Sequence, residues 1–142
     1  MKITIQGEPV AKKRPRFFVK QGKKLAYNAQ SDIESEIAWK LKAAKLEANF
    51  NDSAVAYEIE IRFFFRPPPK PKKDREAKLA GLIHHTIKPD LDNLEKHILD
   101  CANGVLYRDD AQIVKLSSSK HYCENPRTEI KITALANGCE EC

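Results

Sequence analysis

The chain has 142 residues, a formal net charge of +5 and 42% hydrophobic residues, which suits one globular domain with its own core. No apolar run approaches the roughly 18 residues that span a bilayer, and the first residues are too polar for a signal peptide. We therefore expect a cytoplasmic protein with no membrane contact and with its four cysteines reduced. The excess of Lys and Arg favours a polyanionic partner such as nucleic acid.

The N-terminal region is predicted to form a strand followed by a basic arm. Residues 2–6 alternate in polarity, as in a half-buried strand. The segment 10–24 then carries seven bases and no acid, and Gly22 indicates a hairpin tip or loop within it. Phe17 and Phe18 lie among these bases. They are interpreted either as rings that stack on the bases of a nucleic acid or as packing residues in the core or in a dimer interface.

A helix is predicted over residues 31–48, where apolar residues recur at helical spacing. Ser31 and Glu34 fit a capping box at its start, and Trp39 is expected to pack. Residues 55–66 are rich in β-branched and aromatic types, which predicts a strand.

Prolines end this strand and begin a long basic excursion over residues 67–88, with a short helix near 74–80. Long connections of this kind are usually functional or mobile. A second main helix is predicted to begin at Asp90 and to end near Asn103, and two strands follow at 111–122 and 128–135. The fold class is therefore α+β: a small mixed sheet of about four strands with two main helices, in the order β-α-β-α-β-β.

Acidic residues gather in one part of this basic chain. Residues 88–115 hold six acids against four bases. On the predicted helix, Asp92 and Lys96 share the face opposite the apolar stripe, and Asp90 lies at the helix start. A return of the chain is expected to bring Asp110 beside Asp90 and Asp92. Clustered carboxylates suit Mg²⁺, which prefers oxygen ligands and bridges acids to phosphate.

Simpler interpretations of the same acids stay open on the residues alone. Asp90 is then only a helix cap, Lys96 only a surface ion-pair partner of Asp92 or Asp100, and Asp109-Asp110 only a turn. The cysteine pair Cys139 and Cys142 has zinc-ligand spacing. Because a structural site usually needs a second such pair, no zinc site is expected.

Three segments resemble the RusA family of Holliday junction resolvases. Residues 88–96 (KPDLDNLEK) and 104–114 (GVLYRDDAQIV) are similar to the core signature of that family, and residues 7–16 (GEPVAKKRPR) resemble the opening of its phage and prophage members. Many members have arginine directly before the first aspartate, whereas Pro89 stands there in this chain. The resemblance identifies residues 1–136 as a single RusA-like nuclease domain, followed by a flexible tail at 137–142.

The resemblance implies a homodimeric, Mg²⁺-dependent crossover junction endodeoxyribonuclease, with Mn²⁺ as a substitute metal. Such an enzyme nicks two opposed strands of a four-way DNA junction in recombination and repair. It also implies that Asp90, Asp92 and Asp110 bind the metal and that Lys96 is catalytic. The basic residues expected to contact DNA are Lys12, Lys13, Arg14, Arg16, Lys72, Lys73 and Lys88. The alternative function is a non-catalytic nucleic-acid-binding module. A transferase that uses D-x-D is disfavoured, because the chain has five glycines and no Gly-rich nucleotide loop.

Overall fold

The computed structural model describes residues 1–50 and 53–136. Cys139, Cys142 and the predicted flexible tail lie outside the described residues. The elements in chain order are β1 (Lys2–Gln6), β2 (Arg16–Lys20), β3 (Lys23–Tyr27), α1 (Ser31–Glu47), β4 (Ala56–Phe65), α2 (Lys72–Leu79), α3 (Leu91–Ala102), the 3-10 helix η1 (Asp110–Gln112), β5 (Ile113–Tyr122) and β6 (Arg127–Leu135). No helix in this part of the chain is long and apolar enough to cross a membrane.

Four strands form one mixed sheet in the order β1-β6-β4-β5, which confirms the predicted α+β class. β6 is antiparallel to both β1 and β4, whereas β4 and β5 are parallel. A parallel pair needs a connection that returns to the starting edge of the sheet. The chain between β4 and β5 provides it, and this connection contains both α2 and α3.

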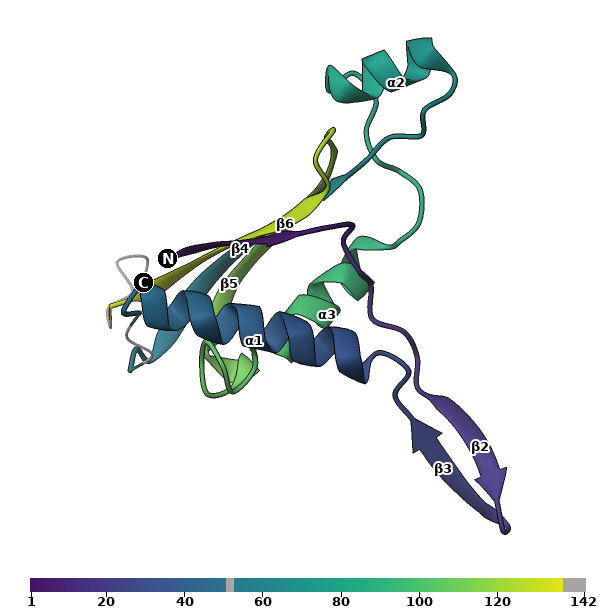
Figure 1. Cartoon of the computed structure of the whole chain (residues 1–142). Helices are drawn as coiled ribbons and strands as arrows, with labels where there is room; N and C mark the ends of the chain where they lie inside the picture. Colours follow the sequence, from purple (N-terminus) through teal and green to yellow (C-terminus); the bar gives the residue numbers. More distant parts are fainter. Residues whose placement is uncertain (51–52, 137–142) are drawn as a thin grey trace.

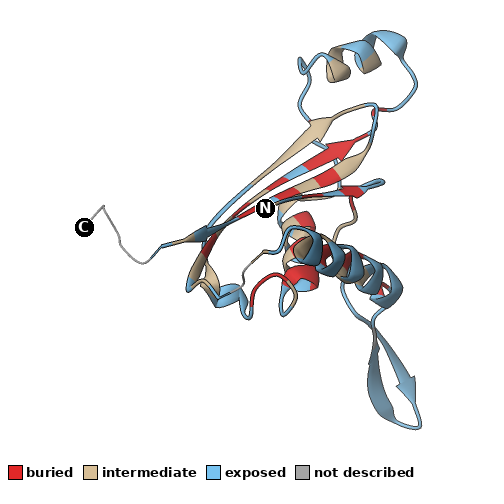
Figure 2. Cartoon of the chain, turned by 60° about the vertical axis from the view of Figure 1, so that its left-hand side comes forward, coloured by how far each residue is buried: buried red, intermediate tan, exposed pale blue. Residues whose placement is uncertain are grey.

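The core lies between one face of the sheet and the two long helices, so the molecule has two layers (Figures 1 and 2). Strand residues alternate between buried and solvated positions, as in the pattern exposed-buried-exposed-buried-exposed of β1. From the helices, Ile37 and Leu41 of α1 and Leu94 and Ile98 of α3 join the same buried cluster. The opposite face of the sheet carries polar side chains, including an ion pair between Arg62 and Glu129 at 3.5 Å.

Two segments project from this body (Figure 1). The first is the β2–β3 hairpin, whose tip at Gln21 and Gly22 adopts positive φ angles of 51° and 72°, so the expected hairpin tip at Gly22 is confirmed. The second is the excursion between β4 and α3, which carries α2. It is held to the sheet where the His85 ring stacks on Phe65, with centroids 4.2 Å apart.

The capping box predicted for α1 is wrong. Gln30 is the N-cap residue, and no side chain caps the helix. The Glu34 carboxylate turns away from the helix start and accepts hydrogen bonds from the Lys12 ammonium at 2.7 Å and the Asn28 amide at 2.8 Å. The expectation that Trp39 packs is also wrong, because its side chain is 70% exposed and contacts the Lys42 ammonium.

One buried side chain conflicts with the apolar core. His97 of α3 is fully buried, and neither ring nitrogen has a hydrogen-bond partner among the described residues. Burial is the main cause that lowers the pKa of His97, opposed by the nearby Glu34 carboxylate. The folded protein therefore resists protonation of this ring more strongly than the unfolded chain does.

We expect His97→Leu to raise the free energy of unfolding by about 1–2 kcal/mol at pH 7.5, because it removes unsatisfied polar atoms from the core. Since folding lowers the pKa of His97, the unfolded chain binds a proton on this ring more readily than the folded protein does. The wild-type protein should therefore lose stability as the pH falls below about 6.5. Urea unfolding at pH 7.5 and 5.5 tests both points. The variant should lose less stability between the two pH values than wild type, and an equal loss in both proteins would contradict the argument.

Candidate metal centre and DNA-binding surface

The first acidic residues occupy the N-terminal end of α3. This helix is amphipathic, with Leu94, Ile98 and Cys101 on its buried face. Asp90 is the N-cap residue, as predicted, with extended φ and ψ of −70° and 144°, and Asp92 lies in the first turn. The positive end of the helix dipole favours negative charge here. Both carboxylates are therefore positioned by the start of a helix that packs firmly on the sheet.

The Asp90 carboxylate does not cap the helix, because it contacts the Lys88 ammonium across Pro89. Lys88 is 82% exposed and Asp90 46% exposed, so this ion pair is open to solvent. A cation already lies against this carboxylate. Lys88 thus reaches the acidic residues despite the intervening proline.

Asp92 and Lys96 are exposed and one helical turn apart, on the solvent side of α3. Within the described part of the chain, Lys96 makes no ion pair. Asp100, the other acid considered as its partner, is bound by Lys12 at 3.0 Å. The interpretation of Lys96 as a surface ion-pair partner therefore has no support in the structure.

Asp109 and Asp110 have different surroundings. Asp109 caps η1: its side chain accepts a hydrogen bond of 2.7 Å from the Ala111 amide, and Gln112 completes a capping box. Asp110 instead lies against the Tyr107 hydroxyl. Burial, followed by this carboxylate, raises the pKa of Tyr107. The Asp109 carboxylate is thus engaged in capping the backbone, whereas the Asp110 carboxylate is not.

The structure does not bring Asp110 beside Asp90 and Asp92 in a single chain. The Tyr107 hydroxyl next to Asp110 donates to the Leu99 carbonyl at 3.2 Å, near the C-terminal end of α3. Asp90 begins the same helix of twelve residues, which is about 18 Å long at 1.5 Å per residue. Among the described residues, no three His, Cys, Asp or Glu side chains are close enough to hold a metal ion. The prediction that the chain returns to bring Asp110 beside Asp90 and Asp92 is therefore wrong within one chain.

The Asp90–Asp92 pair fits Mg²⁺ by its donor chemistry. Mg²⁺ usually keeps several waters and takes one or two carboxylates from the protein. Both carboxylates are at the molecular surface, where water and phosphate oxygens can complete the coordination, and the Lys88 contact shows that Asp90 accepts a cation. One chain thus offers two ligands of the expected set, and the third lies at the other end of the helix.

The predicted DNA-binding residues fall into three places. Lys13, Arg14 and Arg16 are exposed at the base of the β2–β3 hairpin. Lys72 and Lys73 begin α2, a helix with no buried residue, and Lys88 lies beside Asp90. All of these side chains are open to solvent.

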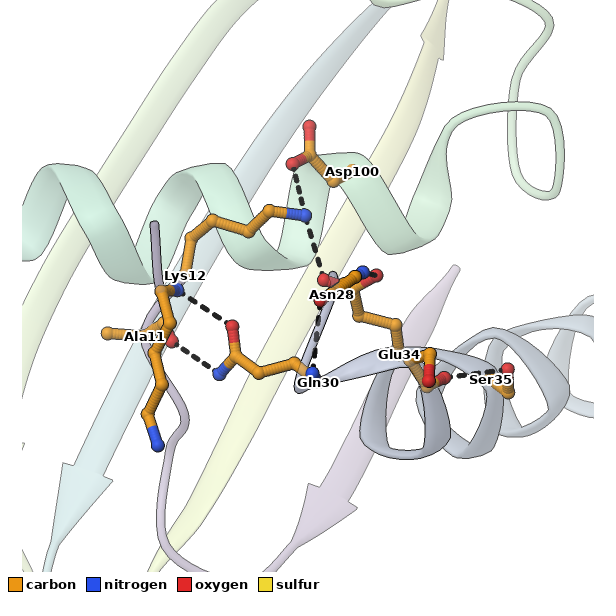
Figure 3. Close-up of polar contacts among 9 residues, drawn as sticks. Ala11, Lys12, Asn28, Gln30, Glu34, Ser35 and Asp100 are labelled. Carbon is orange, nitrogen blue, oxygen red and sulfur yellow. Dashed lines mark hydrogen bonds and ion pairs between the residues drawn. The ribbon is translucent and has the colours of Figure 1, made fainter. Parts of the chain in front are cut away.

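Lys12 differs from the other predicted DNA-binding residues because its ammonium group is paired with two carboxylates of the same chain (Figure 3). Its ammonium lies 2.7 Å from Glu34 and 3.0 Å from Asp100. The hydrogen bond with Glu34 is the main cause that raises the pKa of Lys12. Its backbone amide also donates to the Asn93 carbonyl of α3 at 2.9 Å. The structure therefore makes Lys12 an anchor between the arm and the two helices.

Sequence reasoning missed Gln30 and Lys120. Gln30 is buried, and its side-chain amide donates to the Ala11 carbonyl at 2.9 Å while its oxygen accepts from the Lys13 amide at 2.7 Å (Figure 3). No sequence pattern indicates this role. The Lys120 ammonium on β5 donates to the Pro89 carbonyl at 3.0 Å, directly before Asp90. The sequence signal available for this role was the presence of a lysine, Lys120, within the predicted strand 111–122.

Comparison with known proteins identifies the family of this chain. A family model described as Endodeoxyribonuclease RusA matches residues 6–133. The uncharacterized protein YqaN of Bacillus subtilis (strain 168) is 34% identical over 141 residues, which cover 96% of this chain and 97% of YqaN. The region matched by the family model includes all the acidic residues described above, the basic arm and the excursion. The chain belongs to the RusA endodeoxyribonuclease family.

Proposed function

We propose that this protein is a Mg²⁺-dependent endonuclease that resolves four-way DNA junctions by paired symmetric nicks, as a homodimer. The observation that carries the proposal is the solvent-accessible Asp90–Asp92 pair at the start of α3, with Lys96 exposed one turn further along the same side. Family membership adds the expectation of DNA cleavage. The exposed bases of the arm, α2 and Lys88 supply a surface for phosphates.

Each residue of the proposed site has a chemical role. Asp90, Asp92 and Asp110 would hold the metal, which when bound neutralises phosphate charge and activates water for attack. Lys96 places positive charge where the phosphate gains negative charge in the transition state. Lys88 contacts Asp90 in the absence of metal, and a metal held by Asp90 would leave this ammonium available to contact the substrate. Each of these roles requires a side chain that a metal ion or a phosphate can reach from solvent.

The homodimer proposal follows from the separation of the ligands. Asp110 lies near the C-terminal end of α3, and Asp90 and Asp92 lie at its N-terminal end. A two-fold axis beside the middle of α3 would bring the Asp110 of each chain to the Asp90–Asp92 pair of the other. The contact surface is then isologous, and it creates two equivalent sites, as paired nicking requires.

β5 offers a surface for this contact. It is the edge strand of the sheet, and its side chains Val114 and Leu116 are exposed. Lys120, near the end of β5, binds the carbonyl before Asp90, whereas Asp110 lies just before the start of β5. Two β5 edges related by a two-fold axis run in opposite directions, so the start of one meets the end of the other.

The alternative is a DNA-binding module without catalysis. In that case the acids only shape the ends of helices and the bases only attract DNA. Incubation of the purified protein with mobile and fixed four-way junctions, with and without Mg²⁺, separates the two functions. Metal-dependent nicking supports the nuclease, and stable binding without cleavage supports the module.

Mixing two inactive variants tests the shared site. Asp90→Asn and Asp110→Asn should each abolish cleavage, because each removes a metal ligand from both sites of its own dimer. In a mixed dimer of the two variants, one site carries both substitutions and the other carries none. Mixed dimers should therefore nick one strand of a four-way junction.

The same experiment has a clear opposite outcome. If all three aspartates acted within one chain, every site in the mixture would contain a substitution and no activity would return. A mixture of Asp90→Asn with Asp92→Asn is the matched control, because both ligands come from the same chain and should not complement. Asp109→Asn should retain cleavage and also the η1 cap, because the amide oxygen of asparagine can still accept the hydrogen bond from the Ala111 amide.

Lys96→Ala should lower the cleavage rate far more than it lowers junction affinity. The reason is that its charge acts mainly on the transition state. Single-turnover cleavage with saturating protein measures the rate. The melting temperature should be unchanged, because Lys96 is exposed and makes no ion pair with the described residues. A wild-type rate would remove Lys96 from the site.

Arg14 and Lys12 should respond differently to substitution. Changing Arg14 and Arg16 to Gln should flatten the plot of log K against log salt by about one unit for each phosphate that is no longer bound. Lys12→Gln should leave that slope unchanged and instead lower the free energy of unfolding, by about 1 kcal/mol, because Glu34 and Asp100 lose their partner. Titration of DNA at several salt concentrations and urea unfolding provide the two measurements. Equal slopes for all three proteins would show that the arm does not contact phosphate.

A further inference from the structure

The β2–β3 hairpin is the feature that the proposed chemistry leaves unexplained. All five residues of β2 are exposed, and so are residues 23–26 of β3. A two-stranded ribbon without a face against a core is only marginally stable in water. This one stands away from the body of the molecule (Figure 1).

Strand pairing makes one of its aromatic rings especially accessible. Phe17 is opposite Ala26, and Phe18 is opposite Leu25. Directly opposed residues share a face, and consecutive residues point to opposite faces. Leu25 therefore shields Phe18, whereas the methyl group of Ala26 is too small to shield Phe17. The exposures agree, at 48% for Phe18 and 70% for Phe17. Packing of either ring in the core of the chain is thereby excluded.

The charge of the hairpin selects a polyanion as its partner. Lys20 is directly opposite Lys23 at the tip, and Lys24 follows. Like charges in opposed positions destabilise a strand pair, and no acid lies anywhere in residues 10–27 to offset them. Phosphates relieve this repulsion. A second hairpin of the same chain would increase it.

The base of the hairpin is fixed to the start of α3. The buried Gln30 side chain bridges the Ala11 carbonyl and the Lys13 amide (Figure 3). The Lys12 amide also donates to the Asn93 carbonyl at 2.9 Å. Asn93 directly follows Asp92. DNA held by the hairpin is therefore located relative to the acidic residues of α3.

We propose that this hairpin inserts into the open centre of a DNA branch point, where the Phe17 ring stacks on an exposed base and the tip lysines contact the flanking phosphates. The inference rests on the proposed function, because branched DNA is that function's substrate. A continuous duplex keeps its bases stacked on one another, whereas a branch point interrupts the stack and exposes base faces. The hairpin thus gives the protein a preference for branched over linear DNA.

Fluorescence of 2-aminopurine at the branch point of a synthetic four-way junction tests the proposal, in EDTA so that no cleavage is needed. Wild-type protein should change this fluorescence, and it should leave the same base in a linear duplex unchanged. Phe17→Ala should abolish the change and weaken junction binding about tenfold, the effect of losing one stacked base. It should weaken duplex binding less than twofold. Phe17→Trp should restore both the fluorescence change and the affinity.

Trp39→Ala is the matched control, because Trp39 is equally exposed, at 70%, on the outer side of α1. It should bind and perturb the junction as wild type does. The proposal is overturned if Phe17→Ala keeps the fluorescence change, or if it dissociates the dimer in sedimentation analysis, which would show that a second copy covers the ring. Because the readout is binding without metal, a protein that fails to cleave DNA still tests the hairpin, and a protein that cleaves can still refute it.

Discussion

The parallel pairing of β4 with β5 is the constraint on which the proposed site depends. It requires the chain to return along the sheet between the two strands, and α3 is the last part of that return. The helix consequently runs opposite to β5, with Asp90 near the end of the strand and Asp110 just before its beginning. The strand order thus separates Asp110 from Asp90 and Asp92 within one chain, which is why we propose that a second chain completes the site.

Local sequence patterns predicted the elements well because their causes are local. Alternating polarity located β1 and most of β4, and the prolines after Phe65 ended β4 where expected. β5 begins at Ile113, two residues later than predicted, because Asp109 caps a 3-10 turn there. The two main helices were correct for the same reason, since each depends on an apolar stripe of its own residues.

The failures share a different cause, which is contact between distant segments. Glu34 fits a capping box, but Lys12, 22 residues earlier in the chain, offers it a charged partner. Lys12 is predicted to contact DNA, and the sequence gives no sign that its ammonium pairs with Glu34 and Asp100. The distance between Asp90 and Asp110 depends on the direction of α3 against the sheet, which spacing in the sequence does not encode. The motif proposes which residues form the site, but it does not show how they are arranged in space.

The contact between Lys88 and Asp90 would link the proposed metal binding at Asp90 to the local charge balance. Any divalent cation that takes the Asp90 carboxylate competes with an ammonium group that is part of the same chain. Metal binding at Asp90 would therefore be an exchange, in which the incoming ion releases a tethered positive charge at the surface beside it. By thermodynamic reciprocity, an anion that attracts the released ammonium also strengthens the metal, so metal and phosphate should bind with positive cooperativity.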